Sequence, residues 1–255
     1  MTPYAPLPRL LIERLGKIKS VGAVTGAGIS AESVIPTYRG QGGIYDDPET
    51  GDRTIDALTG ETLRRDPDRT WRTIFELVEK AKDAQPNPGH VALAVIEKRV
   101  ERFVLLTQNV DGLHEAAGSK NIIDIHGTVS NTICMSCGEH SRLDQFGELT
   151  GAPRCKTCDG VMRPDAVLFG EMLPMHKVAR LRREFYGKIP DLLLVAGTTA
   201  MFPYIAEPVL VAQRAGRLTI EVNPEETVLS AVVDYSLRGP AGHYLPKIAE
   251  VIGQG

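Results

Sequence analysis

Four short, largely apolar runs constrain the fold of this chain more than any other feature of its sequence. They read VGAVT at 21–25, FVLL at 103–106, DLLLV at 191–195 and LTIEV at 218–222. Such runs are typical of strands that are covered on both faces of a sheet. Stretches with helical periodicity separate them, and we expect helices over 8–19, 61–82, 90–98, 203–215 and 245–252. Strands that alternate with helices predict an α/β fold with a parallel sheet and helices on both faces.

The length and charge of the chain limit the kind of protein it encodes. With 255 residues it is at the upper end of what one core supports, so we expect a large domain and a smaller one. The net charge is only −3, which gives no general attraction to nucleic acid or to an anionic membrane. No apolar stretch approaches the roughly 18 residues that a membrane-spanning helix needs. Charges also interrupt the leucine-rich N-terminal segment, so we expect no signal peptide and a cytoplasmic enzyme.

All four cysteines lie close together in the sequence, in two C-x2-C pairs separated by seventeen residues. This spacing is typical of a tetrahedral site in which each pair presents two sulfur atoms to one zinc ion. Four thiolates leave no open position for water, so the predicted Zn²⁺ is structural and not catalytic. Four cysteines without a shared role are the alternative. The predicted ligands are Cys134, Cys137, Cys155 and Cys158.

A glycine-rich loop follows the first predicted strand. Residues 26–31, GAGISA, match the pattern G-x-G-x-x-A, which lets the backbone approach the pyrophosphate of a dinucleotide. An ordinary tight turn between a strand and a helix is the alternative. A dehydrogenase of this type has an acidic residue about 20 positions further on to hold the ribose. This chain has the loop GQGGIY at 40–45, within the expected loop 36–54, so hydride transfer fits poorly.

Small or polar residues also follow other apolar segments. They are TQNVDGLH at 107–114, IHG at 125–127 and AGTT at 196–199, and each comes after an apolar strand or pair. In an open α/β sheet, ligands bind at the carboxyl ends of the strands. Because several such loops converge on one edge of the sheet, the sequence predicts a nucleotide site there.

The order of these motifs resembles that of the sirtuins, the NAD-dependent protein-lysine deacylases. The matching segments are GAGIS, PTYRG, TQNVDGLH, HG, the paired C-x2-C, VLFGE, AGTT and VNPEE, spread over residues 8 to 252. The resemblance implies a Rossmann-like NAD-binding domain formed by 1–40, 85–130 and 160–255. It also implies a small domain, with a helical module and a zinc module, formed by 41–84 and 131–159.

The resemblance further implies a reaction in which NAD⁺ is a co-substrate and acyl-lysine proteins or peptides are the substrates. In sirtuins the acyl carbonyl oxygen attacks C1′ of the ribose as nicotinamide leaves, which gives an imidate. His126 stands in the family's His-Gly position and is implied to be the general base that takes a proton from the ribose hydroxyls. An imidazole with an ordinary pKa of about 6.5 suits this role at neutral pH. A structural, hydrogen-bonded histidine is the alternative.

The family's cofactor residues carry over onto the loops of this chain. Asn109, implied to be catalytic with His126, and Asp111 are similar to residues that orient the ribose and bind the carboxamide. A helix N-cap is the alternative role of Asp111. The implied NAD-binding set is Gly26, Ala27, Gly28, Ser30, Thr37, Tyr38, Arg39, Gln108, Asn109, Val110, Asp111, Gly197, Thr198, Thr199, Asn223 and Ala241.

The implied acyl-lysine site contains Val167, Phe169, Gly170 and Glu171. In this segment the backbone pairs with the substrate and the side chains line the acyl-lysine tunnel. Core packing on a strand is the alternative for Val167 and Phe169, and both roles are compatible.

Two departures from the family motifs bear on the acyl group. The common Pro-Asp-Phe-Arg has threonine at Thr37, as in the class III branch that removes acidic acyl groups, and a frequent glycine is replaced by Val34. That branch uses a Tyr-x-x-Arg pair, whose positions here are Ile74 and Leu77. Two apolar side chains cannot compensate a buried carboxylate. We therefore expect removal of acetyl or longer neutral acyl groups and weak activity on succinyl-lysine.

Other functions stay open. An NAD hydrolase or a mono-ADP-ribosyltransferase uses the same electrophilic ribose, and a hydrolase releases nicotinamide without a peptide. A non-catalytic NAD-binding module has no need of His126. A dehydrogenase reduces its cofactor, which absorbance detects.

Overall fold

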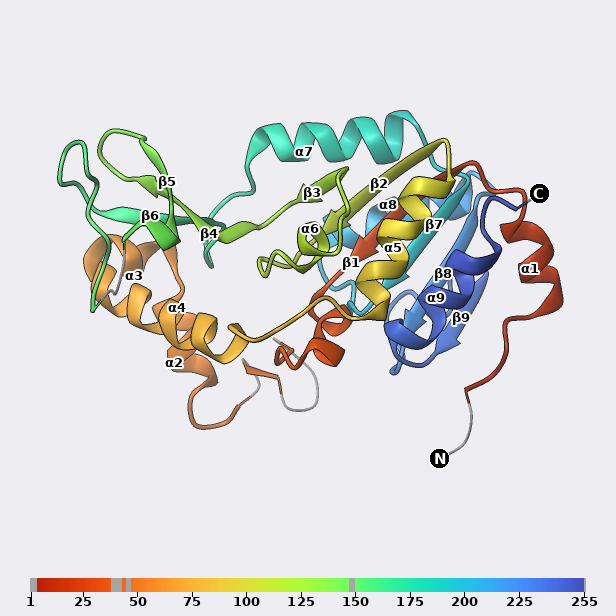
Figure 1. Cartoon of the computed structure of the whole chain (residues 1–255), viewed down its shortest axis with the longest axis horizontal. Coiled ribbons are helices and arrows are strands. Elements are labelled where there is room, and N and C mark those ends of the chain that lie inside the picture. Colours follow the sequence, from red (N-terminus) through yellow and green to blue (C-terminus); the bar gives the residue numbers. More distant parts are fainter. Residues whose placement is uncertain (1–3, 38–42, 45–46, 147–149, 255) are drawn as a thin grey trace.

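The computed structural model describes residues 4–37, 43–44, 47–146 and 150–254, and its larger part contains a six-stranded parallel sheet (Figure 1). The strands lie in the order β3–β2–β1–β7–β8–β9. Their bounds are β1 Ser20–Thr25, β2 Arg102–Thr107, β3 Ile122–Asp124, β7 Leu192–Ala196, β8 Leu218–Asn223 and β9 Tyr235–Arg238. The chain moves outward from β1 in both directions, so the strand order reverses between β1 and β7. Sheets of this kind bind ligands in the crevice at that point, outside the carboxyl ends of the strands.

Helices cover both faces of the sheet, which confirms the predicted α/β fold class. One face packs against α1 (Arg9–Leu15), α5 (Pro88–Arg99) and α9 (Ala241–Val251), and the other against α7 (Met175–Leu181), the π-helical turn η5 (Arg182–Gly187) and α8 (Pro203–Arg214). On β1, Val21 and Ala23 belong to the first core and Val24 to the second. Because both faces need apolar side chains, the central strands β1, β2, β7 and β8 are largely apolar runs in the sequence.

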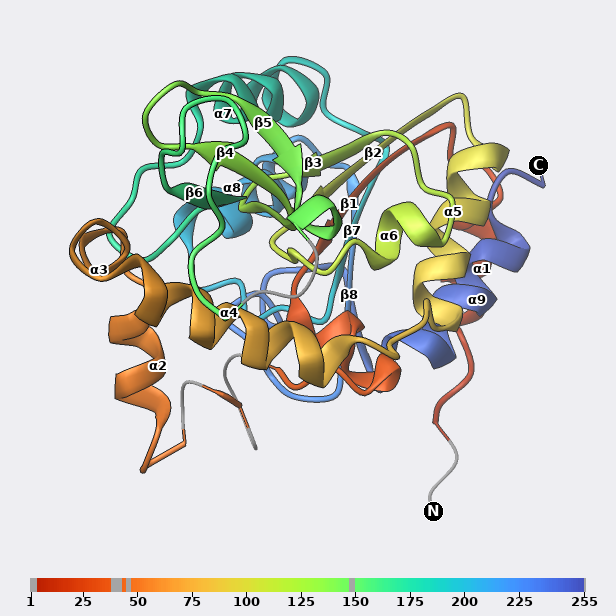
Figure 2. The same cartoon turned by 60° about the vertical axis from the view of Figure 1, so that its left-hand side comes forward.

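A smaller unit lies at one end of the long axis, at the left of Figure 1, and comes toward the viewer in Figure 2. It contains an antiparallel sheet, β5–β4–β6, and three helices. The bounds are α2 Gly51–Ala57, α3 Gly60–Arg65, α4 Pro67–Ala81, β4 Gly127–Cys134, β5 His140–Arg142 and β6 Met162–Ala166. Trp71 on α4 is fully buried, and its indole N–H donates to the carbonyl of Met162 at 2.8 Å. This bond ties the helices to the small sheet.

Two of the expected domain boundaries fall within the small sheet or next to it, and the boundary between 84 and 85 lies between α4 and α5. The boundary between 130 and 131 divides β4, and the boundary between 159 and 160 lies just before β6. The division into two domains at these positions stays a proposal.

Several local predictions differ from the structure. The helix expected over 61–82 is two helices, because Asp66 caps a new helix that Pro67 begins. Helix α2 begins at Gly51, inside the stretch expected to be loop, and α9 begins at Ala241, before the expected start at 245. Strand β9 and the small sheet have no counterpart in the prediction, since their strands lack continuous apolar runs. Within the described ranges, no helix has the length and apolar character needed to cross a bilayer.

Candidate functional site

The glycine loop after β1 packs directly against the loop after β7. It contains two 3-10 turns, η1 (Ala27–Ile29) and η2 (Ala31–Ser33), in place of the helix expected after the loop. The N–H of Gly28 donates to the carbonyl of Gly197 at 2.8 Å. A Cβ on Gly28 would lie 2.8 Å from the Cα of Gly197, and Gly197 itself has a φ of +61°. Only residues without side chains allow this contact between two backbones.

Side chains from neighbouring strands join the same edge of the sheet. The amide of Gln108, after β2, donates to the Thr198 hydroxyl at 2.8 Å. The amide of Asn223, at the end of β8, donates to the carbonyl of Thr198 at 3.1 Å. The sheet thus brings together predicted cofactor residues that lie far apart in the sequence, at its carboxyl edge.

A buried polar cluster connects the glycine loop to the loop after β2. The Ser30 hydroxyl donates to Asp111 at 2.7 Å and accepts from the amide of Asn109 at 3.1 Å. The side chain of Asp111 also accepts the N–H of Leu113 at 3.0 Å, at the start of α6 (Leu113–Ala116). Asn109 is 5% exposed, and its Oδ1 has no hydrogen-bond partner among the described residues. A buried, unpaired acceptor costs about 1–3 kcal/mol, so this oxygen marks a place where a ligand N–H or O–H fits.

Two buried histidines lie beside this cluster, and neither is among the predicted site residues. His90 Nε2 is 3.4 Å from the Ser30 hydroxyl, and His114 Nε2 is 3.0 Å from the hydroxyl of Thr25. Burial lowers the pKa of His90, and it lowers the pKa of His114 to about 3. Both rings are therefore neutral at pH 7. Their positions in the segments NPGH and TQNVDGLH were the available sequence signal.

His126 lies between β3 and β4, and both of its ring nitrogens have partners. Nδ1 is 3.0 Å from the carbonyl of Gln108, and Nε2 is 2.7 Å from the hydroxyl of Tyr204. A carbonyl only accepts, so Nδ1 carries the hydrogen and Nε2 has the basic lone pair. Burial lowers the pKa of His126, against the effect of the Gln108 carbonyl, and the positive charge of Lys177 lowers it further. The ring is neutral at pH 7.

The segment 167–171 connects His126 to the smaller unit. The N–H of Val167 donates to the carbonyl of His126 at 2.8 Å. Two residues on, the N–H of Phe169 donates to the carbonyl of Leu58 at 2.9 Å, and its carbonyl accepts from the N–H of Gly60 at 3.1 Å. The segment therefore runs from His126, the predicted base, to the helices of the smaller unit.

A salt bridge fixes the C-terminal end of the segment 167–171. Arg163 on β6 binds both carboxylate oxygens of Glu171, at 2.8 and 2.7 Å, and the N–H of Leu168 donates to one of them at 3.0 Å. Burial acts to raise the pKa of Glu171, but these bonds outweigh it and the pKa lies below its ordinary value. Gly170 has a φ of +79°, which suits glycine at this turn.

The two positions expected to face the acyl group belong to the apolar core of the smaller unit. Ile74 is 3% exposed and packs with Leu58 and Trp71, and Leu77 and Phe169 pack against the same cluster. The structure thus brings Ile74 and Leu77 together with Phe169 of the predicted acyl-lysine segment.

The remaining predicted cofactor residues lie at varied depths. Ala27 and Thr37 are partly buried, Val110 is partly buried with its carbonyl 3.4 Å from the N–H of Val129, and Thr199 is exposed. Ala241 is buried at the start of α9, and the next residue's N–H donates to Glu32 of η2 at 2.7 Å. Tyr38 and Arg39 lie outside the described residues.

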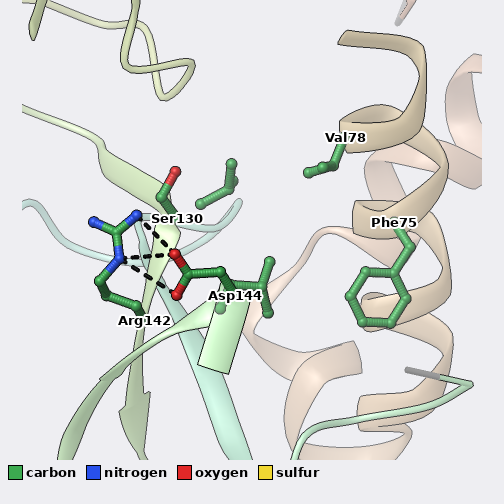
Figure 3. Close-up of a pocket in the computed structure, with 7 residues that line it drawn as sticks. Phe75, Val78, Ser130, Arg142 and Asp144 are labelled. Carbon is green, nitrogen blue, oxygen red and sulfur yellow. Dashed lines mark hydrogen bonds and ion pairs between the residues drawn. The ribbon is translucent and has the colours of Figure 1, made fainter. Parts of the chain in front are cut away.

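The smaller unit also has a shallow groove of about 390 Å³ between α4 and the small sheet (Figure 3). Arg142 and Asp144 form an ion pair of 3.0 Å along it, opposite Phe75 and Val78 of α4. Its lining residues are Phe75, Val78, Val129, Ser130, Arg142, Leu143 and Asp144. None of the predicted NAD, acyl-lysine or zinc residues lines this groove.

The four cysteines converge at the end of the small sheet. All four sulfur atoms lie within 4.8 Å of one another, with Cys134 and Cys158 3.5 Å apart and Cys137 and Cys155 3.7 Å apart. Tetrahedral Zn–S bonds of about 2.3 Å place sulfur atoms roughly 3.8 Å apart, so the arrangement fits the ion. The cluster is consistent with one structural zinc.

Each C-x2-C pair forms the same kind of turn. The N–H of Gly138 donates to the carbonyl of Cys134 at 3.0 Å, and that of Asp159 donates to the carbonyl of Cys155 at 2.9 Å. Both turn residues have positive φ, +76° for Gly138 and +59° for Asp159. The two turns present their sulfur atoms to a common centre, as the spacing predicted.

The reversal of strand order, the glycine loop and the buried polar cluster define a nucleotide-binding α/β protein. The model of the Sir2 family matches residues 26–202, and the chain belongs to this family. It is 43% identical over 256 residues to NAD-dependent protein deacylase 2 of Pseudomonas aeruginosa, with 99% of each protein covered. The predicted resemblance to the sirtuins is confirmed.

Solved structures agree with this assignment. A crystal structure of a Sir2 homolog–NAD complex has a TM-score of 0.84 and 36% identity, covering 98% of this chain and 95% of that one. A Sir2 variant with a deacetylated p53 peptide and 3′-O-acetyl ADP-ribose has a TM-score of 0.83 and 26% identity, covering 96% and 98%.

Proposed function

We propose that this protein is an NAD-dependent protein-lysine deacylase that transfers the acyl group to ADP-ribose and releases nicotinamide. The observation that carries the proposal is the pair of acceptors at the end of β2 and after β3. These are the buried, unpaired Oδ1 of Asn109 and the basic Nε2 of His126. The hydrogen bond from Nδ1 of His126 to the carbonyl of Gln108 links the histidine to the residue that precedes Asn109. Relatives named NAD-dependent protein deacylase and Sir2 structures that contain NAD support it.

In the proposed site the loops at the carboxyl edge of the sheet hold NAD. The glycine loop and the loop at 197–199 receive the phosphates and the adenosine half, because glycines let the backbone approach a pyrophosphate closely. Asn109 and Asp111 orient the nicotinamide ribose and bind the carboxamide. When bound, NAD supplies an electrophilic C1′ and ribose hydroxyls, and His126 takes a proton from one of these hydroxyls.

The acyl-lysine is proposed to bind along 167–171, next to His126 and the apolar cluster of the smaller unit. Ile74 and Leu77, the two positions that hold the carboxylate partners in the class III branch, are both apolar and lie in that cluster. An unpaired carboxylate is costly to bury, so we propose neutral acyl groups as substrates. A cytoplasmic location and the lack of nucleic-acid and membrane partners stay predictions.

The proposal is tested by mass spectrometry of acetyl- and succinyl-lysine peptides incubated with the protein, with and without NAD. We expect one nicotinamide and one O-acetyl-ADP-ribose for each lysine freed, and a higher kcat/KM for the acetyl peptide. Nicotinamide release that is independent of peptide would favour the NAD hydrolase instead. A higher kcat/KM for the succinyl peptide would contradict the proposed acyl preference.

The role of His126 is tested by His126→Ala, with His140→Ala as the control because His140 is exposed on β5. Loss of a positioned general base lowers turnover by about 100-fold or more. We expect this loss for His126→Ala and an unchanged rate for the control. Parental deacylation by His126→Ala would remove the histidine from the mechanism.

A further inference from the structure

Tyr204 is a residue of this site to which no sequence motif pointed. It is the second residue of α8, next to Pro203, and its ring stacks on Phe202 with centroids 5.4 Å apart. The ring of His126 meets it edge-on at 6.0 Å. Its hydroxyl lies 2.7 Å from Nε2 of His126, 78 residues away in the sequence.

The direction of this hydrogen bond follows from the other side of the imidazole. Nδ1 of His126 donates to the Gln108 carbonyl, so Nε2 is the acceptor and the tyrosine hydroxyl donates. Burial raises the pKa of Tyr204 to about 12, which keeps the hydroxyl protonated and able to donate. The lone pair of Nε2 is therefore occupied by Tyr204.

This occupancy conflicts with the role proposed for His126. A ribose hydroxyl can pass its proton to Nε2 only if it donates a hydrogen bond to the same lone pair. The imidazole has one basic lone pair, so the ribose and Tyr204 compete for it.

We propose that Tyr204 is a positioning residue that caps Nε2 of His126 while the cofactor is absent and releases it to a ribose hydroxyl when NAD binds. The inference rests on the proposed function, because it needs His126 to act on the ribose. The cap keeps the imidazole in the Nδ1–H form, with Nε2 pointing to the place where the proton is collected. A hydrogen bond between neutral groups contributes little net free energy, because one partner replaces another. The bond from Tyr204 can therefore be exchanged for one from a ribose hydroxyl.

The surroundings of Tyr204 allow the release. Tyr204 is only partly buried, and Phe202, on which it stacks, is 47% exposed. Among the described residues, His126 is the hydrogen-bond partner of the hydroxyl, so no second bond holds the ring in place.

The decisive experiment is the binding of ADP-ribose to Tyr204→Phe, measured by calorimetry. ADP-ribose has the competing ribose and needs no turnover, so the result does not depend on deacylation. Removing the competitor should lower the Kd by about two- to tenfold. The control is Tyr186→Phe. It deletes a hydroxyl that donates at 3.0 Å to Glu207 on α8, the helix that contains Tyr204, and its Kd for ADP-ribose should equal the parental value. An unchanged Kd for Tyr204→Phe overturns the cap.

A second readout is the titration of His126, followed by nitrogen NMR of the labelled, ADP-ribose-free protein. A donor to Nε2 favours the neutral ring, so its loss should raise the pKa of His126 in Tyr204→Phe. The other groups acting on the ring, the Gln108 carbonyl and Lys177 with its partner Asp124, are the same in both proteins. An unchanged or lowered pKa contradicts the cap.

Turnover separates the cap from the proposed function. If the parental protein frees no lysine, the proposed function fails, whereas the Kd and the titration still report on the tyrosine. If the parental protein is active, the cap predicts a lower KM for NAD in Tyr204→Phe, in line with the lower Kd for ADP-ribose. A kcat at least tenfold lower, with exchange of labelled nicotinamide into NAD retained, would make the hydroxyl part of the proton path and overturn the cap.

Discussion

Val34 has a backbone conformation that conflicts with its side chain. It follows η2 with a φ of 64° and a ψ of 19°, in the left-handed region, and is 85% exposed. A branched Cβ is strained there, whereas glycine is not. The sequence comparison with the family had already identified Val34 as a replacement for a frequent glycine, and the structure supplies the reason that glycine suits this position.

Val34→Gly should therefore stabilise the protein by about 1 kcal/mol, because relief of the left-handed strain exceeds the entropy cost of glycine. The measurement is the free energy of unfolding from urea denaturation. Val34→Ala is the matched control, since it keeps a Cβ and should gain less than half as much. A Val34→Gly protein less stable than its parent would show that Val34 is not strained.

At the scale of elements, the break between α3 and α4 shows where periodicity misleads. The apolar positions continue with helical spacing across 61–82, so the pattern predicts one helix. The local signal is Asp66-Pro67, in which Pro67 begins α4 and Asp66 accepts the N–H of Arg69 at 3.1 Å. Capping rules applied residue by residue would have found this boundary.

Removing the cap tests this account of the break. Asp66→Ala leaves an N–H of the first turn of α4 without its partner and should lower the free energy of unfolding by about 1 kcal/mol. Asp83→Ala is the control, because Asp83 is exposed beyond the end of α4 and should change stability by less than about 0.5 kcal/mol. Equal effects of the two substitutions would contradict a capping role.

For the whole molecule, the smaller unit depends on contacts that link its parts. Its buried core is small, formed by Leu58, Trp71 and Ile74 with partly buried neighbours. The indole of Trp71 bonds to the carbonyl of Met162 on β6, and the cysteine cluster lies at the same end of that sheet, where Met162 pairs with Cys134. A core of this size needs a further cross-link, which four thiolates on one zinc provide.

Loss of the metal should therefore destabilise the protein as a whole. Cys134→Ser should bind less than one zinc per chain and lower the midpoint of thermal unfolding by more than about 5 °C. Elemental analysis and calorimetry measure the two effects. Met135→Ala is the control, because Met135 is 42% exposed in the same turn and is not a ligand. Parental protein without stoichiometric zinc would contradict the assignment.

The sequence by itself determined the features that depend on local pattern. Strands buried on both faces are largely apolar, so the runs at β1, β2, β7 and β8 were recognisable without tertiary structure, although β8 also buries Thr219 and Glu221. The spacing of the cysteines predicted the zinc cluster, and the order of the motifs predicted the family. The half-buried strands of the small sheet and β9 were missed, because alternating or short apolar patterns give too weak a signal.

Only the tertiary structure decided which side chains meet. Tyr204 pairs with Nε2 of His126 although the two residues lie 78 positions apart in the chain. The pairing arises because β3 ends and α8 begins at the same edge of the sheet. The same holds for the unpaired oxygen of Asn109 and for the contact of Gly28 with Gly197. The physical reason is that the local sequence pattern reflects burial, whereas contacts between distant residues depend on the order of the strands in the sheet.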